Sequence, residues 1–431
     1  MNTFPTGSGA SSARAPAAPS AKAASTRARR RIVRRSYHAS RGADSASLPR
    51  GRAPLRPAGG NSVRSLETLR PRPGLSVPVV TVLDAGGRLL EADQRRVVRH
   101  VVQDGFGADI VFAAGTTGEW HRVSNAVRQQ VVRVCAEEVA KGNARLAPGV
   151  PPVEAWAGIT AHTPEDTLDN LRFAAEAGAD AAVLAPLSVR GLRDPVRFVA
   201  RDVADVLDAL PRRIPVYLYD NADIAADPRV PHIRTRDVKA LSRLDFVRGI
   251  KVTAPRKVMG NYTRAAAGFR ERGEFGIYVG DAFQIFDLFR PRRGLAGAIA
   301  EHWQRRRLRG GLPIGVVAGP ANALPREWAR AWQVCRAGDA ERMERVRRVL
   351  EAFRDGTRAA GGKRAVACMK RALLRDGVIS SDAVAEGTPA LARPDAERFD
   401  EVYERVRALA RELLEPPWVT RADRAPERAA P

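Results

Sequence analysis

From about residue 75 onward, short apolar runs alternate with longer stretches in which apolar residues recur every three or four positions. The short runs are typical of strands buried on both faces, and the three-to-four spacing is typical of helices with one buried face. The pattern predicts eight strands, near 77–83, 109–114, 153–159, 181–186, 215–219, 247–251, 276–279 and 314–318.

The best-defined helix follows the third predicted strand. Thr163 is a candidate N-cap, Pro164 suits the first helical position, and Gly178 marks the end. Ser124 is a candidate cap of the preceding helix, whose apolar residues recur between 127 and 135. Helical turns therefore separate the strands.

Eight strand–helix units in about 250 residues favour an α/β fold of the (β/α)8 TIM barrel type over residues 75–325. No G-x-G-x-x-G follows the first strand, which argues against a dinucleotide-binding fold. Apolar residues at helical spacing over 326–415 predict a C-terminal helical appendage. The segments 1–74 and 416–431 are expected to be disordered tails.

The net charge of +24 is unevenly distributed, because residues 1–74 hold fourteen arginines and one lysine against only Asp44 and Glu67. This basic segment is compatible with a solvated tail, with organellar targeting, or with binding of phosphate backbones. No recognised nucleic-acid-binding motif accompanies it, so nucleic acid is an unfavoured partner.

Other features exclude several classes of protein. No run of 18 apolar residues predicts a membrane-spanning helix. The three widely spaced cysteines do not form a disulfide framework, and the histidines lack metal-ligand spacing. We therefore expect a cytoplasmic protein without a metal or cofactor.

The candidate chemistry lies where predicted strands end, because barrel enzymes carry their active sites at that face. Lys251 ends the sixth strand, where burial disfavours an ammonium ion and frees an amine to attack a ketone. A structural lysine, turned outward or paired with Asp281, is the alternative. Tyr219 ends the fifth strand and is either a proton carrier or a core aromatic residue, whereas Tyr217 is more typical of the core.

The turn Gly115-Thr-Thr-Gly118 follows the second strand. Its hydroxyls and backbone N–H groups suit a carboxylate, although a glycine-permitted turn with a capping threonine is the simpler interpretation.

Three motifs follow one another on these strands: Gly115-Thr-Thr-Gly-Glu119, Tyr219 and Gly249-Ile-Lys251. Together they resemble the dihydrodipicolinate synthase/N-acetylneuraminate lyase family, over roughly residues 75–393. The resemblance implies that Lys251 forms a Schiff base with pyruvate or another 2-oxo acid, and that Tyr219 and Thr116 relay protons. It further implies that Gly115, Thr116 and Thr117 bind the carboxylate, that Val317 lies against the substrate, and that the chain forms a homodimer or homotetramer. The co-substrate would be an aldehyde or a sugar acid, with aldol chemistry and dehydration both left open.

Three departures from the family pattern bear on the substrate. The segment after Tyr219 reads Asp220-Asn221-Ala222 in place of Asn-X-Pro. Ile224 stands where synthases acting on aspartate semialdehyde carry arginine, and the loop after strand four, residues 186–188, lacks their tyrosines. These differences argue against the lysine-pathway reaction.

Gly280 and Gly315 are 35 positions apart, which predicts an arginine-rich insertion near 288–312. Besides a lyase, the sequence leaves open a catalytically silent barrel that binds ligands or regulates, and nucleic-acid association through the basic tail.

Overall fold

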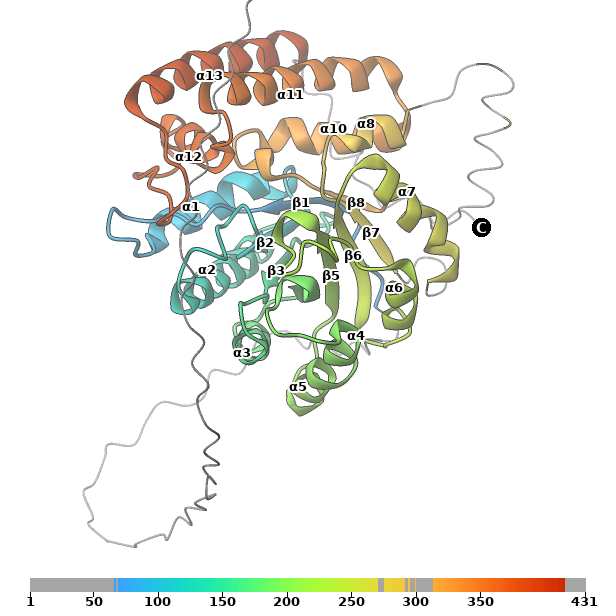
Figure 1. The fold of residues 1–431 in the computed structure, drawn as a ribbon. Coiled ribbons are helices and arrows are strands. Elements are labelled where there is room, and N and C mark those ends of the chain that lie inside the picture. The colour runs from blue at the N-terminus through green and yellow to red at the C-terminus, as the bar shows by residue number, and fades with distance from the viewer. Residues whose placement is uncertain are drawn as a thin grey trace, which may run out of the picture. The chain divides into compact units, whose positions relative to one another are not determined.

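The computed structural model describes residues 69–269, 275–290 and 313–414, with Leu66, Gly294 and Ile299. Eight parallel strands close into a barrel in chain order, with β1 hydrogen-bonded to β8 (Figure 1). The strands are β1 Gly74–Pro78, β2 Ile110–Ala113, β3 Glu154–Gly158, β4 Ala181–Leu184, β5 Val216–Asn221, β6 Val247–Thr253, β7 Gly276–Val279 and β8 Gly315–Val317. The predicted (β/α)8 barrel is confirmed.

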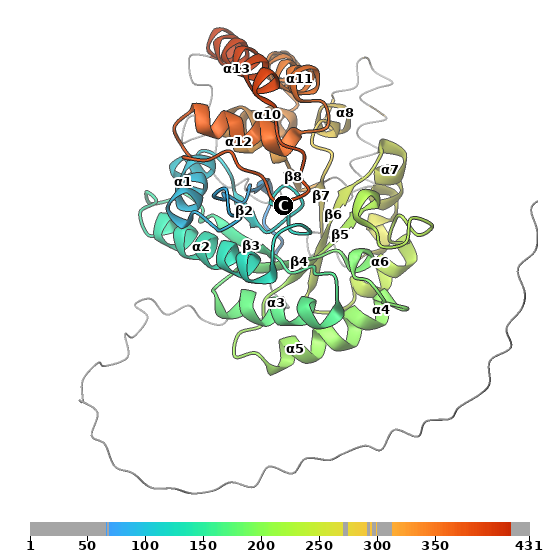
Figure 2. The ribbon, with the colours of Figure 1, turned by 60° about the vertical axis from the view of Figure 1, so that its left-hand side comes forward.

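The helices form two groups, which Figures 1 and 2 show from two sides. Those that follow the strands of the barrel are α1 Glu91–Val102, α2 Asn125–Asn143, α3 Pro164–Glu176, α4 Pro195–Phe198, α5 Ala204–Ala209, α6 Thr235–Leu241, α7 Arg256–Ala265 and α8 Gln284–Leu288. The C-terminal helices are α10 Pro325–Ala337, α11 Ala340–Gly361, α12 Ala365–Arg375 and α13 Arg393–Leu414. The predicted helical appendage is therefore present.

The caps expected from the sequence are formed. The Ser124 hydroxyl accepts a hydrogen bond from the Val127 N–H, and the Thr163 hydroxyl accepts one from the Asp166 N–H. Such side chains satisfy backbone donors that an isolated helix start leaves without partners. The caps fix where α2 and α3 begin, directly after loops that leave the barrel.

The prediction of a first strand over 77–83 was wrong in its bounds. β1 begins at Gly74, inside the segment that had been expected to be a tail, and ends at Pro78. Beyond it, the Val80 and Val82 N–H groups bond to the side chains of Asn322 and Gln94, not to a neighbouring strand. Apolar composition alone could not reveal that side chains, and not a neighbouring strand, accept the hydrogen bonds of Val80 and Val82.

Aromatic rings fill the interior of the barrel. Tyr217 stacks on Trp156 with ring centroids 4.0 Å apart, and Tyr278 meets both rings edge-on. Gly249 makes room for this layer, because a Cβ atom there would lie 2.8 Å from the Tyr217 ring. Tyr217 is therefore a core residue, as predicted, and Tyr219 lies two residues nearer the strand end.

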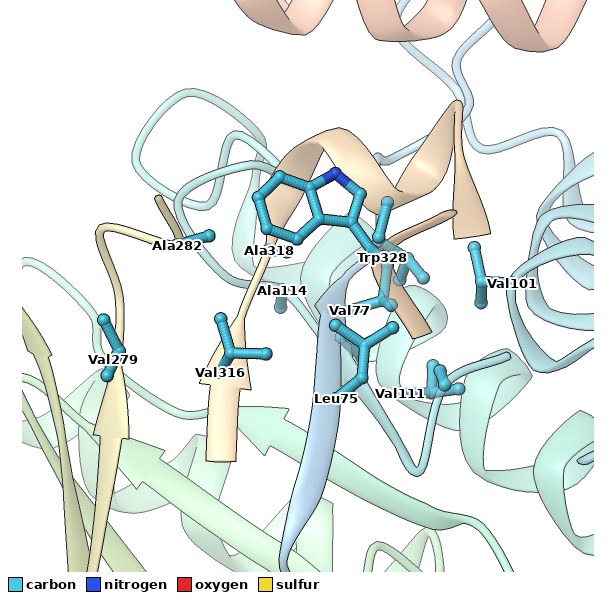
Figure 3. Close-up of a cluster of buried hydrophobic side chains, with 14 of the residues drawn as sticks. Leu75, Val77, Val101, Val111, Ala114, Val279, Ala282, Val316, Ala318 and Trp328 are labelled. Carbon is cyan, nitrogen blue, oxygen red and sulfur yellow. The ribbon is translucent and has the colours of Figure 1, made fainter. Parts of the chain in front are cut away.

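A second apolar layer joins the barrel to the C-terminal helices. Trp328 of α10 is completely buried and packs over side chains from β1 and β8, among them Val77 and Val316 (Figure 3). Burying an aromatic side chain of this size contributes strongly to stability. The C-terminal helices thus share one core with the barrel.

Replacing Trp328 with alanine should lower the free energy of unfolding by about 3–5 kcal/mol, because it removes a buried ring and leaves a cavity. Denaturant unfolding monitored by circular dichroism measures this loss. Val230→Ala, at a half-exposed side chain (45%), is the control and should change stability by less than about 0.5 kcal/mol. A Trp328→Ala variant as stable as the control would show that the layer contributes little.

Most of the predicted insertion at 288–312 and most of both predicted tails lie outside the described residues. Within the described part of the chain, no helix is both long and apolar enough to span a bilayer.

Candidate active site

Lys251 and Tyr219 lie side by side at the carboxyl ends of adjacent strands. The register of β5 and β6 places them directly opposite each other. Both side chains are almost completely buried, with exposed fractions of 6% for Lys251 and 5% for Tyr219. The Lys251 amine nitrogen lies 3.8 Å from the centroid of the Tyr219 ring and 5.1 Å from that of Phe112.

These surroundings do not fit the alternative of a lysine paired with Asp281. The Asp281 carboxylate instead accepts a hydrogen bond from Gln284 at the start of α8. The faces of aromatic rings attract a cation weakly while excluding water. The Lys251 nitrogen is therefore placed inside an apolar mouth beside a phenol.

The Tyr219 hydroxyl is surrounded by polar groups. The Thr116 hydroxyl oxygen lies 3.3 Å away, and the Asn221 amide donates to the phenol oxygen over 3.0 Å. Burial by itself would raise the pKa of Tyr219, but the positive charge of Lys251 and the neighbouring Thr116 and Thr253 hydroxyls outweigh it, so the pKa is lowered. This phenol is easier to deprotonate than an ordinary tyrosine.

The predicted turn, residues 115–118, is flanked by strained backbone. Ala114 and Glu119 both have positive φ angles, of 52° and 58°, which non-glycine residues rarely adopt. Gly115 is required, because a Cβ atom there would lie 2.9 Å from the Phe112 ring. Strain of this kind persists only where surrounding contacts impose it, and it is common at functional sites.

The two threonines of the turn point in different directions. Thr116 faces Tyr219, whereas the Thr117 hydroxyl lies beside Gly319, next to the end of β8. Val317 of β8 is 3% exposed and belongs to the same interior apolar cluster as Tyr219. The structure thus gathers the predicted site residues around the ends of β2, β5, β6 and β8.

Contacts from other parts of the chain fix the turn. The Thr81 hydroxyl donates to the Gly118 carbonyl over 2.7 Å. The Glu119 carboxylate accepts from the Lys370 ammonium over 2.6 Å and from the Ala385 N–H over 2.8 Å. Both members of this ion pair are fully buried, so α12 and the segment after it hold the turn from the C-terminal side.

Sequence reasoning missed the roles of several of these residues. Glu119 was noted only as part of a family motif and Asn221 only as a departure from one, and Thr81 and Lys370 were given no role. The signal for Lys370 was a lysine on the buried face of a helix, where an ammonium needs a partner. Its partner is 251 positions away, so spacing alone could not identify it.

Comparison with known proteins agrees with this geometry. Residues 72–184 match the model of the Dihydrodipicolinate synthetase family. The chain is therefore similar to this family over the first part of the barrel. A relative from Methylibium petroleiphilum, named 4-hydroxy-tetrahydrodipicolinate synthase, is 26% identical over 65% of this chain and 81% of its own length. Another of that name, from Thermus thermophilus, is 28% identical over 61% of this chain and 74% of its own.

Solved structures of family members have the same fold. Dihydrodipicolinate synthase from Bacteroides thetaiotaomicron superposes with a TM-score of 0.62 at 19% identity, covering 78% of this chain and 99% of that one. A prophage protein of the family from E. coli K12, solved in complex with pyruvate, gives a TM-score of 0.60 at 17% identity, covering 78% and 98%.

Replacing Lys370 with methionine should lower the free energy of unfolding by about 3–5 kcal/mol, because it leaves the buried Glu119 carboxylate without its cation. The double variant Glu119→Gln/Lys370→Met should regain much of that loss, since the introduced glutamine carries no charge and its oxygen can still accept from the Ala385 N–H. Denaturant unfolding of both variants measures the difference.

The control breaks an exposed ion pair instead. Arg393→Met removes the partner of Glu397, where the side chains are 91% and 62% exposed, and should change stability by less than about 0.5 kcal/mol. A Lys370→Met variant that matched this control would contradict a role for the buried pair in holding the turn.

Proposed function

We propose that the protein is a lyase that forms a Schiff base between Lys251 and pyruvate or a related 2-oxo acid. The observation that carries this proposal is the placement of the Lys251 nitrogen, buried at the end of β6 and 3.8 Å from the Tyr219 ring. The family relationship supports the same chemistry, as does the pyruvate complex of the E. coli K12 family member.

The proposed reaction begins when the neutral amine attacks the ketone carbon of the 2-oxo acid. Loss of water from this adduct gives an iminium ion, which withdraws electrons from the adjacent carbon. Removal of a proton from that carbon gives an enamine, which adds to an aldehyde; the reverse sequence cleaves the same bond. Water then hydrolyses the iminium and frees the amine.

Protons must move in each of these steps. Tyr219 is suited to carry them, because its pKa is lowered and its hydroxyl lies 3.3 Å from that of Thr116. Thr116 and Thr117 are both half-buried residues of the turn, and each carries a hydroxyl that can donate to a carboxylate. In this proposal the strained turn binds the carboxylate while Lys251 reacts with the neighbouring ketone.

The co-substrate differs from aspartate semialdehyde in this proposal. Ile224, which stands where the resemblance expects arginine, packs against the interior apolar cluster and offers no charge for a second carboxylate. Aldol chemistry and dehydration of a sugar acid use the same iminium and both remain within the proposal.

The intact set of Lys251, Tyr219 and Thr116 counts against a silent barrel. A homo-oligomeric state and a cytoplasmic location stay predictions.

Borohydride reduction in the presence of pyruvate should attach a stable adduct to Lys251, because reduction converts the iminium to a secondary amine. Intact mass and peptide mapping locate the adduct. Lys251→Ala should abolish both the adduct and turnover while the fold is retained, and Lys257→Ala, at an exposed lysine of α7, is the matched control. If folded wild-type protein forms no adduct with any 2-oxo acid, or Lys251→Ala still turns over, the proposal is wrong.

A further inference from the structure

Asn221 occupies a position that the family motif does not explain. The register of β5 and β6 pairs Tyr219 with Lys251 and Asn221 with Thr253. Alternate residues of a strand face the same side, so Asn221 lies on the Tyr219 face, one step nearer the mouth. Asp220 between them faces the other way, where its carboxylate accepts from the Ile233 N–H and lies 2.8 Å from the His232 ring nitrogen.

The orientation of the Asn221 amide is fixed by a second hydrogen bond. Its oxygen accepts from the Asp223 N–H over 3.1 Å and caps the short 3₁₀ turn Ala222–Ile224. The other end of the amide, which can only donate, is therefore the end that faces the Tyr219 hydroxyl. Asn221 is 8% exposed, so little water competes for this bond.

The direction of this bond matters for proton transfer. Because the Asn221 amide donates to the phenol oxygen, it cannot accept the phenol proton, which leaves the neighbouring hydroxyls as acceptors, among them that of Thr116, 3.3 Å away. When Tyr219 gives up that proton, the Asn221 donor remains and stabilises the phenolate.

We propose that Asn221 is a positioning residue for the reaction, which directs the Tyr219 proton toward Thr116 and stabilises the phenolate during proton transfer. This inference rests on the proposed Schiff-base function for its role in turnover, although the hydrogen bond itself can be tested without substrate.

The test uses two variants that keep the cap but remove the donor. Serine and aspartate both accept a backbone N–H at such a turn, so Asn221→Ser and Asn221→Asp should fold like wild type. The ionisation of Tyr219 is followed by phenolate absorbance, taken as the difference between each protein and the same protein carrying Tyr219→Phe. Thermal unfolding checks that each variant is folded.

In wild type, Tyr219 should ionise below the pH of an ordinary tyrosine. Its titration midpoint should rise by about one pH unit in Asn221→Ser, because a hydrogen bond to the charged form is lost. It should rise further in Asn221→Asp, where a carboxylate faces the phenolate. With a 2-oxo acid substrate, kcat should fall about tenfold in Asn221→Ser while KM changes less.

Titration midpoints and kcat values equal to those of wild type in both variants would overturn the inference, as would a wild-type Tyr219 that ionises at or above the ordinary pH. A fall in kcat without any change in the Tyr219 midpoint would also overturn it, because that pattern indicates only a general loss of structure. Absence of a borohydride adduct on wild-type Lys251 would refute the proposed function alone, since the ordering of midpoints needs no substrate.

Discussion

The burial of the Lys251 amine against the face of Tyr219 is the contact on which the rest of this site depends. Both side chains are almost completely buried, so the amine is held at a fixed place beside the phenol. The barrel makes this placement possible because β5 and β6 run parallel in register, with Tyr219 opposite Lys251. The Phe112 ring lies beside the amine, and Thr116 and Asn221 supply polar groups to the phenol.

The remaining contacts impose a conformation that the backbone would not adopt alone. The turn after β2 has two non-glycine residues at positive φ, and its end is tied to α12 through Glu119 and Lys370. A buried ion pair seldom adds much stability, but it strongly penalises any arrangement in which its members separate. The C-terminal helices are thereby coupled to the geometry of the site, in addition to sharing a core with the barrel through Trp328.

Much of the fold could be predicted from the sequence, because strands buried on both faces and helices buried on one leave different apolar periods. These periods identified the eight strands, and residue type and position identified the Ser124 and Thr163 caps. The bounds of β1 were not, since side chains of Asn322 and Gln94 accept from the backbone of the apolar residues that follow the strand. The sequence indicated Lys251, Tyr219 and Thr116 by their positions at strand ends. It could not indicate the long-range partnership of Glu119 with Lys370, nor the amide orientation of Asn221, because both depend on tertiary contacts.

A crystal structure of the protein soaked with pyruvate would show whether Lys251 forms the Schiff base. We expect continuous density between the Lys251 nitrogen and the former ketone carbon, with the carboxylate bound by the turn at Thr116 and Thr117 and the Tyr219 hydroxyl beside the new bond. Pyruvate bound elsewhere, or an unmodified Lys251 at saturating pyruvate, would contradict this expectation.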